Sequence, residues 1–398
     1  MYENLAILAI FAFLYSVVSG RLDRTPVNGA VVYLVFGVIA GPVGLGFLDL
    51  SIGTEGIRLV AELTLALVLF TDASNANFAV LRRVFRLPGR LLLVGLPLTI
   101  LFGMAVGFVL FPELGWIEIA VLATMLAPTD AALGKAVVSN PAVPATVRQG
   151  LNVESGFNDG ICVPILFTFL ALASGEGAGE SQGAIALHFL THEVGIGLGV
   201  GLGFAATGAW LLRRAADRGW IEGPWLGIPI AALAFACFTT AQSTGGSGFI
   251  ACFCGGLAFG ALTSERKVAV LEGAETIGEA LSLLTWVAFG AAAVLQYGGE
   301  VDWRVVSYAV LSLTVVRMLP VFLCVTGLGV STDAKLFLGW FGPRGLASIV
   351  FVVIVGGHDL PGGETLITTV IVTVVLSILA HGLTANPLST VFAARREA

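Results

Sequence analysis

Two carboxylates and an amide stand at the start of one long apolar stretch of the sequence. Glu154, Asn158 and Asp159 lie close together, and the chain is then mostly apolar to about residue 174. On a helix, Glu154 lies over Asn158 and Ser155 lies over Asp159, so the polar groups form one stripe. A carboxylate inside a membrane is costly unless a counter-charge, a cation or a proton compensates it, so Asp159 is predicted to bind a small cation or a proton in turn. Asn158 and the hydroxyls of Ser155 and Thr129 would add the oxygen ligands that hard cations prefer.

Glu154 needs a positive partner if it is ionised inside the membrane. Two arginines stand within other apolar segments, Arg317 and Arg344. Either guanidinium would hold Glu154 charged and leave Asp159 as the group that titrates. The alternative is that Asp159 is only a helix-end acid in water, but its position in an apolar segment favours a functional carboxylate.

Proline interrupts two of the apolar segments, and a charge stands beside each interruption. The first is the sequence APTD at residues 127–130, and the second is FGPRG at residues 341–345. Proline removes a helical hydrogen bond and clashes with the preceding turn, so each segment is expected to break there. An acid beside helix N-termini and a base beside C-termini would neutralise the exposed ends, which assigns a structural role to Asp130 and Arg344. Two ordinary proline kinks are the alternative.

The composition of the chain is that of a polytopic membrane protein. Of its 398 residues, 57% are hydrophobic and 12% are charged, and the mean hydropathy is +0.95. Soluble domains have about 25% charged residues, so lipid must be the solvent for most of this chain. A membrane-spanning helix needs about 20 apolar residues, and thirteen runs approach that length. They are residues 4–20, 27–48, 57–71, 91–111, 117–138, 149–174, 184–212, 225–243, 248–263, 280–297, 304–328, 335–356 and 365–388.

The basic residues favour alternate connections between these segments. Most follow the odd-numbered segments, at residues 21–24, 82–90, 148, 213–218, 266–267, 335 and 395–396. By the positive-inside rule these connections are cytoplasmic, which places the N-terminus outside and the C-terminus inside a bacterial-type plasma membrane. Residues 1–19 lack a basic start and a cleavage site, so they are expected to form the first membrane helix. The net charge of −6, without a basic tract, excludes a nucleic-acid partner.

The two interrupted segments take matching positions in two halves of the chain. They are the fifth segment of residues 1–174 and the fifth segment of residues 225–388, with 184–212 as the connecting helix. Since one helix separates the halves, they enter the membrane from opposite sides, as in an inverted repeat. Paired broken helices of this kind mark the binding site of many transporters. The sequence therefore predicts a single all-α transporter domain.

At these positions the sequence resembles a known family. Glu154-Ser155, followed by Asn158-Asp159-Gly160, looks like the E-S-x-x-N-D-G signature of NhaP-like sodium/proton antiporters. Thr129-Asp130, Arg317 and the G-x-R-G at residues 342–345 match three further motifs, in the family's order. This resemblance covers essentially the whole membrane domain.

The resemblance implies a fold and a mechanism. It implies an NhaA-like antiporter fold with an ion-binding bundle and a dimerisation domain, a homodimer, alternating access and a Glu154–Arg317 ion pair. It also implies electroneutral exchange, because electrogenic relatives have two adjacent acids where this chain has Asn158 and Asp159. Members often read T-D-P where this chain has Ala131 after Asp130. Many have a glutamate near the position of Asp72, which makes Asp72 a possible accessory acid.

Three other interpretations were weighed. The sequence GGSG at residues 245–248 with His381 resembles the serine and histidine of rhomboid proteases, although the rest of the rhomboid pattern is missing. A passive cation channel would need a continuous pore rather than broken helices around one acid. His188 and His192 are one helical turn apart but have no clear third ligand for zinc. The glycines of residues 195–203 favour close helix packing over a nucleotide loop.

No cofactor, resident metal or enzyme activity is expected from the sequence. The five cysteines lie inside apolar runs without metal-binding spacing, so they are expected to act as small hydrophobic residues. The segment around Arg266, Lys267 and Glu279 is amphipathic, and we expect it to form a separate linker helix at the cytoplasmic surface.

Overall fold

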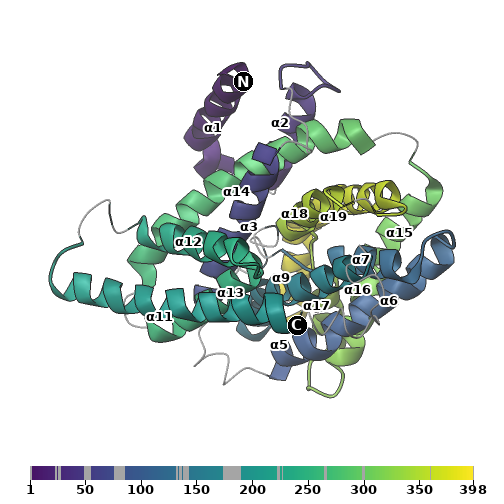
Figure 1. The fold of residues 1–398 in the computed structure, drawn as a ribbon. Coiled ribbons are helices and arrows are strands. Elements are labelled where there is room, and N and C mark those ends of the chain that lie inside the picture. The colour runs from purple at the N-terminus through teal and green to yellow at the C-terminus, as the bar shows by residue number, and fades with distance from the viewer. Residues whose placement is uncertain are drawn as a thin grey trace. The chain divides into compact units, whose positions relative to one another are not determined.

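The computed structural model describes residues 2–22, 25, 28–48, 55–75, 86–130, 133, 137, 143–173, 190–221, 225, 227–263, 267–297, 301–358 and 360–397. Throughout this part of the chain the regular structure is helical, as Figure 1 shows. The elements are α1 (Tyr2–Leu22), α2 (Gly29–Ala40), α3 (Glu55–Asn75), α5 (Arg86–Arg90), the π-helix η1 (Leu91–Gly95), α6 (Leu96–Leu110), α7 (Trp116–Met125), α9 (Ala145–Ala173), the π-helix η2 (Leu190–Val194), α11 (Gly195–Asp217), α12 (Pro229–Ser243), α13 (Gly248–Leu262), α14 (Lys267–Tyr297), α15 (Trp303–Leu313), α16 (Val315–Cys324), α17 (Thr332–Trp340), α18 (Leu346–Gly356) and α19 (Gly363–Glu397).

Many of these helices are apolar enough for a membrane. Within the described residues, six stretches are long enough to cross one: Tyr2–Leu22, Arg86–Leu110, Ala145–Ala173, Thr191–Asp217, Trp303–Cys324 and Gly363–Phe392. Shorter apolar helices, α2, α7, α12, α13 and α18, accompany them. The prediction of an all-α, multi-pass membrane protein is confirmed.

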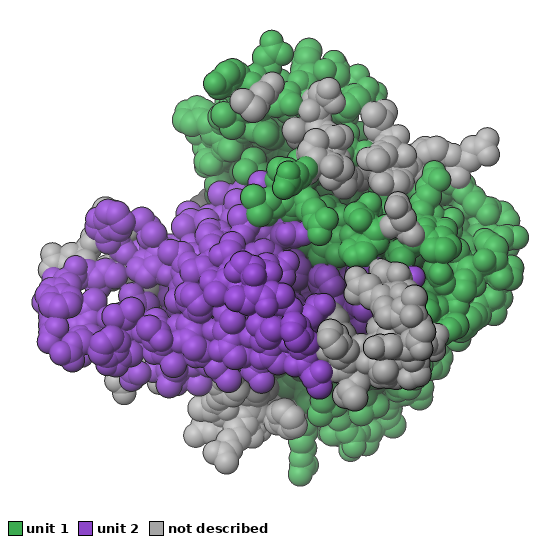
Figure 2. Space-filling view, in the orientation of Figure 1, with its two compact units in different colours: residues 1–59, 84–158, 283–398 green, residues 60–83, 159–282 purple. Residues whose placement is uncertain are grey.

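The chain forms two compact units, which Figure 2 shows in different colours. Unit 1 comprises residues 1–59, 84–158 and 283–398, and unit 2 comprises residues 60–83 and 159–282. Helices α3, α9 and α14 each begin in one unit and end in the other. The two sequence halves expected above describe an internal repeat rather than these units, and that repeat stays a prediction.

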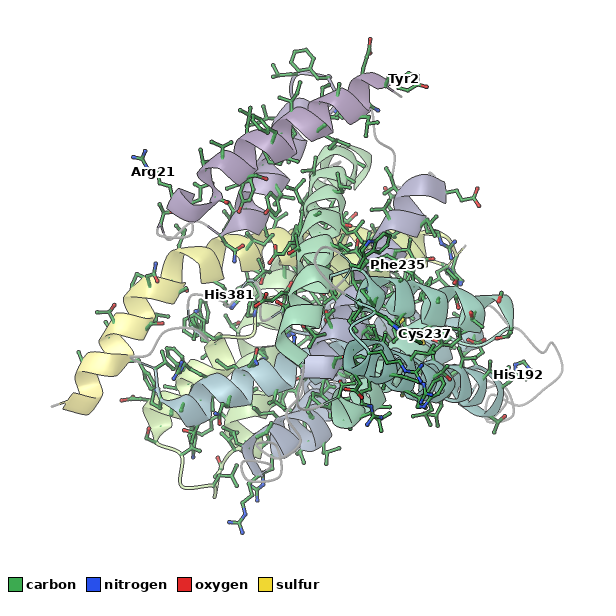
Figure 3. All side chains as sticks on the ribbon, turned by 90° about the vertical axis from the view of Figure 1, so that its left-hand side faces the viewer. Tyr2, Arg21, His192, Phe235, Cys237 and His381 are labelled. Carbon is green, nitrogen blue, oxygen red and sulfur yellow. The ribbon has the colours of Figure 1, made fainter. Side chains whose placement is uncertain are left out.

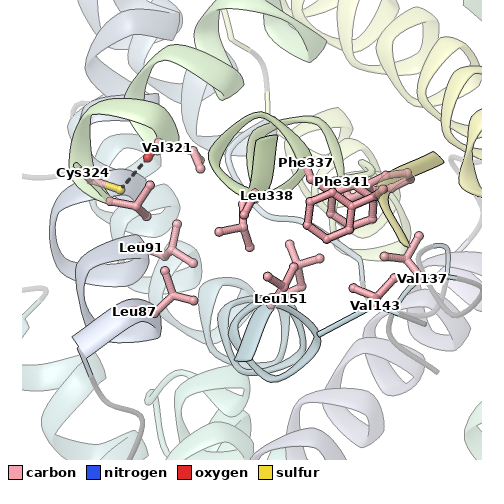
Figure 4. Packing of buried hydrophobic residues seen from close by; sticks show 14 of the residues in the cluster. Leu87, Leu91, Val137, Val143, Leu151, Val321, Cys324, Phe337, Leu338 and Phe341 are labelled. Carbon is pink, nitrogen blue, oxygen red and sulfur yellow. Dashed lines mark hydrogen bonds between the residues drawn. The ribbon is translucent and has the colours of Figure 1, made fainter. Parts of the chain in front are cut away.

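Unit 1 is built around a buried apolar cluster that Figure 4 shows from close by. Its members come from α5, η1, α9, α16, α17 and α19: Leu87, Leu91, Val137, Val143, Val147, Leu151, Val321, Cys324, Val325, Ala334, Phe337, Leu338, Phe341, Ala385 and Phe392. Around it α16 packs against α6 and α17, while α19 packs against α15 and α18. In lipid, close packing and dispersion rather than escape from water hold such helices together.

Unit 2 uses glycines for close helix contacts. A Cβ atom on Gly197 or Gly201 of α11 would collide with backbone oxygens of Ser247 and Ala251, at the start of α13. The α13 glycines Gly256 and Gly260 likewise abut the backbone of α3. Spacing of four residues places each pair on one helix face, as in other small-residue membrane interfaces. The glycine run therefore serves packing at two of its positions, as the sequence favoured.

Two segments differ from their expected form. The eleventh expected segment, 304–328, is divided at Thr314 (φ −107°, ψ −90°) into α15 and α16. The Thr314 hydroxyl donates to the Val310 carbonyl, and such back-bonding bends helices. The expected linker helix is instead continuous with the next span as α14, because its apolar side has protein to pack on: Leu271 and Ala274 are buried.

Candidate functional site

The two helix breaks meet within unit 1. Helix α7 ends at Met125 and α17 ends at Trp340, and the residues that follow each are not helical. The Asp130 amide donates to the Pro343 carbonyl over 2.8 Å, which joins the two breaks through their backbones. Beyond Asp130 only residues 133 and 137 of the first broken segment are described, and Ala131 lies outside them.

Asp130 and Arg344 exchange charges across this contact. The Asp130 carboxylate accepts from the amide of Leu346, in the first turn of α18, over 3.0 Å. Arg344 is fully buried, and its Nη1 donates to the carbonyls of Ala127 (2.6 Å) and Pro128 (3.0 Å), just beyond the end of α7. An acid thus lies at a helix N-terminus and a base at a C-terminus, where each stabilises the partial charge of the helix end.

The second break depends on its glycines. A Cβ atom on Gly345 would overlap the Asp130 carboxylate. On Gly342 it would overlap Nε of Arg317 and lie 3.0 Å from Cγ2 of Thr129. Glycine is required at both positions because two charged side chains and the first break approach the backbone directly.

Glu154 and Arg317 form a buried, two-point ion pair. Nη1 of Arg317 lies 2.5 Å from Oε1 of Glu154, and Nη2 lies 2.8 Å from Oε2. Each side chain is 2% exposed. The sequence left Arg317 and Arg344 as alternative partners, and the structure places Arg317 against Glu154 and Arg344 at the end of α7.

The next turn of α9 holds the first break. Ser155 donates its hydroxyl hydrogen bond to the carbonyl of Thr129, and Nδ2 of Asn158 donates to the Thr129 hydroxyl over 2.7 Å. Asn158 is 1% exposed, and its Oδ1 has no hydrogen-bond partner among the described residues. Because the amide nitrogen is held by Thr129, this carbonyl oxygen faces outward from the contact as a ready acceptor or ligand.

Asp159 follows directly on the same helix. Helix α9 passes from unit 1 into unit 2 between Asn158 and Asp159, and the Asp159 side chain is half-buried. Gly160 comes next, and a Cβ there would collide with the ring of Phe253 of α13. Asp72 also belongs to unit 2, where its side chain is exposed near the end of α3.

Helix α19 contributes residues that the sequence did not assign to the site. Nε2 of His381 lies 2.8 Å from the Trp340 carbonyl, and its Nδ1 lies 3.2 Å from the Ser377 hydroxyl (Figure 3). The same hydroxyl accepts from the Arg344 amide over 2.7 Å. His381 and Ser377 thereby hold both sides of the second break. A histidine inside an apolar segment was the available signal, since such groups need a partner in lipid.

These contacts weaken the protease interpretation. Ser247 is 4% exposed, and its hydroxyl caps α13 by accepting from the Ile250 amide. His381 is engaged with Trp340 and Ser377, as described above. His188 lies outside the described residues, and within those residues no group of three metal-binding side chains comes together.

Comparison with known proteins identifies the family. The family model described as sodium/hydrogen exchanger, transmembrane, matches residues 7–391. The chain belongs to the sodium/hydrogen exchanger family. The resemblance drawn from the sequence motifs is therefore confirmed.

Relatives in this family include named antiporters. The K(+)/H(+) antiporter NhaP2 of Shewanella oneidensis is 24% identical over 388 residues, which are 95% of this chain and 64% of that protein. The Na(+)/H(+) antiporter of Saccharomyces cerevisiae is 27% identical over 380 residues, covering 89% of this chain and 38% of that protein. The chain thus spans just under two thirds of the length of the NhaP2 relative.

Solved structures in the family share the fold. The sodium proton antiporter MjNhaP1 from Methanocaldococcus jannaschii at pH 8 superimposes with a TM-score of 0.74 at 21% identity, over 98% of each chain. Its electron-microscopy structure gives a TM-score of 0.79 at 20% identity, over 98% of this chain and 97% of that one. The predicted antiporter fold is confirmed.

Proposed function

We propose that the chain exchanges a monovalent cation, Na⁺, K⁺ or Li⁺, for a proton, with the Asp159 carboxylate taking up one or the other. The observation that carries this proposal is the different state of neighbouring groups on α9. The charge of Glu154 is matched by Arg317, whereas the buried Oδ1 of Asn158, one residue before Asp159, has no partner among the described residues. An oxygen of this kind beside a carboxylate suits an alkali cation.

The broken helices supply the rest of the mechanism. Alkali cations need several oxygen ligands, and the Thr129 and Ser155 hydroxyls stand in the same turn as Asn158. Without the cation, Asp159 takes a proton, because a bare carboxylate is costly at this depth. Alternating access then moves the loaded carboxylate between the two sides, as in other transporters with discontinuous helices. The relatives' names, K(+)/H(+) and Na(+)/H(+) antiporter, support exchange of this class.

Four further features belong to this proposal. The chain works in the plasma membrane as a homodimer, with its N-terminus outside and its C-terminus in the cytoplasm. Residues 1–174 and 225–388 are inverted repeats. Exchange is electroneutral and requires no cofactor, because only the transported cation and proton take part. Asp130 and Arg344 serve the broken helices rather than the transported ion.

A transport assay with two matched aspartate variants tests the proposal. Purified protein in proteoliposomes is given a proton gradient, and its dissipation is followed as Na⁺, K⁺ or Li⁺ is added. The wild type and Asp217→Asn, a change at the end of α11, should respond to a cation. Asp159→Asn should abolish the response while folding normally, since an amide can neither ionise nor titrate. Cation-dependent proton movement by Asp159→Asn at about a tenth of the wild-type rate or more would refute the assignment.

A further inference from the structure

One helical stretch of unit 1 carries basic and apolar side chains on the same exposed face. Arg86 and Arg90 lie in α5, and Leu93 and Val94 lie in η1, which continues it. All four are exposed, Leu93 by 68% and Val94 by 44%. Residues three or four apart share a helix face, so the stripe begins basic and becomes apolar. None of these residues belongs to the ion site described above.

The opposite face of this stretch is fixed in the core. Leu87 and Leu91 are buried in the apolar cluster of Figure 4, and Gly150 of α9 packs closely on Leu87. Pro97, which follows η1, has no amide hydrogen to donate to the preceding turn, and wide π-type turns accommodate such a gap. The exposed stripe therefore belongs to a well-anchored helix.

A hollow of about 370 Å³ opens between the stripe and the turn after α16. Arg86, Arg90, Leu93 and Val94 line it on one side, and Gly327 lines it on the other. Gly327 has a left-handed backbone (φ +84°), and a Cβ built there would find no atom within 4 Å. The hollow thus has room for a ligand, with a basic end and an apolar end.

The positive charge at the basic end is positioned but not neutralised. Nη1 of Arg90 donates to the carbonyls of Cys324 (3.2 Å) and Thr326 (2.8 Å), which fixes the guanidinium and leaves Nε and Nη2 as donors. Lys335 adds a further positive charge, with its Nζ 3.3 Å from the Thr326 hydroxyl. In the described part of the chain, no carboxylate forms a salt bridge with Arg86 or Arg90.

The chemistry of this hollow matches one component of the surrounding membrane. Arginine forks suit phosphate oxygens, and basic pockets between membrane helices bind anionic lipid headgroups. A helix rises about 1.5 Å per residue, so Leu93 lies roughly 10 Å beyond Arg86 along the axis, the step from a headgroup to its acyl chains. We propose that the hollow binds an anionic phospholipid, with its phosphate on Arg86 and Arg90 and its acyl chains along Leu93 and Val94.

Binding there would join α5 to the end of α16 more firmly. Arg90 already connects the two elements through the Cys324 and Thr326 carbonyls. An anionic phosphate would add a second bridge from Arg86 and relieve the repulsion between neighbouring cations. The bound lipid should therefore raise the melting temperature of the protein, whether or not a cation gradient is present.

The test measures lipid binding and needs no transport activity. Purified full-length protein in detergent is titrated with phosphatidylglycerol or phosphatidylcholine, and bound lipid is counted by native mass spectrometry. Arg86→Gln should weaken the tightest phosphatidylglycerol site by about fivefold, the effect of one basic residue at a membrane surface, and leave phosphatidylcholine unchanged. Arg213→Gln, an exposed arginine at the end of α11, is the matched control and should bind phosphatidylglycerol like the wild type.

Two further arms decide the source of the phosphate and guard against misfolding. Leu93→Gln, which keeps both arginines, should also weaken phosphatidylglycerol binding, and its melting curve without lipid shows whether it is folded. Equal phosphatidylglycerol affinity in the wild type, Arg86→Gln and Leu93→Gln would overturn the proposal. It would also fail if millimolar inorganic phosphate alone stabilised the wild type as much as the lipid does, because the hollow would then be a site for free phosphate.

Discussion

Glu154 and Asn158 occupy successive turns of α9, yet their surroundings differ. Both carboxylate oxygens of Glu154 are bound by Arg317, so this end of the polar stripe is a closed ion pair. Asn158 uses its nitrogen to hold Thr129 and leaves Oδ1 without a partner among the described residues, directly before Asp159. The comparison indicates that one end of the stripe supports the structure and the other is free to bind. Changes at the two ends should therefore have different consequences.

The largest loss of stability is expected at the closed end. Glu154→Gln or Arg317→Gln each leaves one buried charge unmatched, which should cost about 3–5 kcal/mol and lower the melting temperature in detergent as well as transport. The double variant should be more stable than either single one. If the three losses in a double-mutant cycle are simply additive, the two residues are not partners.

A smaller loss is expected where the second break presses on the first. Gly345→Ala would place a methyl group against the Asp130 carboxylate, which should cost about 1–3 kcal/mol and disturb the contact between the two breaks. Gly356→Ala in the same helix is the control, since its Cβ would meet only Ile367, at an ordinary 3.7 Å. Equal melting temperatures for the two variants would show that the crossing has room that the structure does not predict.

The contact from α19 should matter less again. His381→Ala removes the donor to the Trp340 carbonyl and should cost about 1–2 kcal/mol, with slower exchange because the second break loses a support. His381→Gln keeps a donor and should recover part of both losses. His358→Ala, at the end of α18, is the matched control. A melting temperature unchanged in His381→Ala would remove His381 from the support of the break.

Much of this arrangement could be predicted from the sequence because lipid makes each charge informative. Asp130, Glu154, Arg317 and Arg344 stand out in apolar segments, and each needs a partner there. The sequence could not choose between Arg317 and Arg344 for Glu154, because that choice depends on how distant segments pack. Thr129 was predicted only as a ligand, and the structure shows that it also connects the first break to α9.

Other features were hidden because their signals point elsewhere. His381 resembled a catalytic histidine, although its burial beside the end of α17 explains it better. The amphipathic start of α14 looked like a surface helix, since hydrophobic periodicity does not say whether the apolar side faces lipid or protein. The division at Thr314 leaves no proline at the break itself, so no breaker residue marked it.

The smallest effect concerns the open end, where the imposed voltage should hardly change the exchange rate. The count behind this expectation is one titrating acid. Asp159 carries either one cation or one proton in each direction, while Glu154 stays paired with Arg317 and moves no net charge. Asp130 accepts from Leu346 and Leu133 at the breaks, which assigns its charge to helix ends rather than to transport.

Voltage dependence in proteoliposomes measures that count directly. Na⁺/H⁺ exchange should proceed at the same rate with and without a potassium-diffusion potential set by valinomycin, because equal charge crosses in both directions. Asn158→Asp provides the contrast: a second acid in the same turn can carry an additional proton, so its exchange should become voltage-sensitive if the variant transports at all. Asp72→Asn tests the remaining candidate acid and should leave the wild-type behaviour unchanged, since Asp72 is exposed on α3. A steep voltage dependence in the wild type that Asp72→Asn abolishes would show that two acids titrate per cycle, and the open end of the stripe would then not act alone.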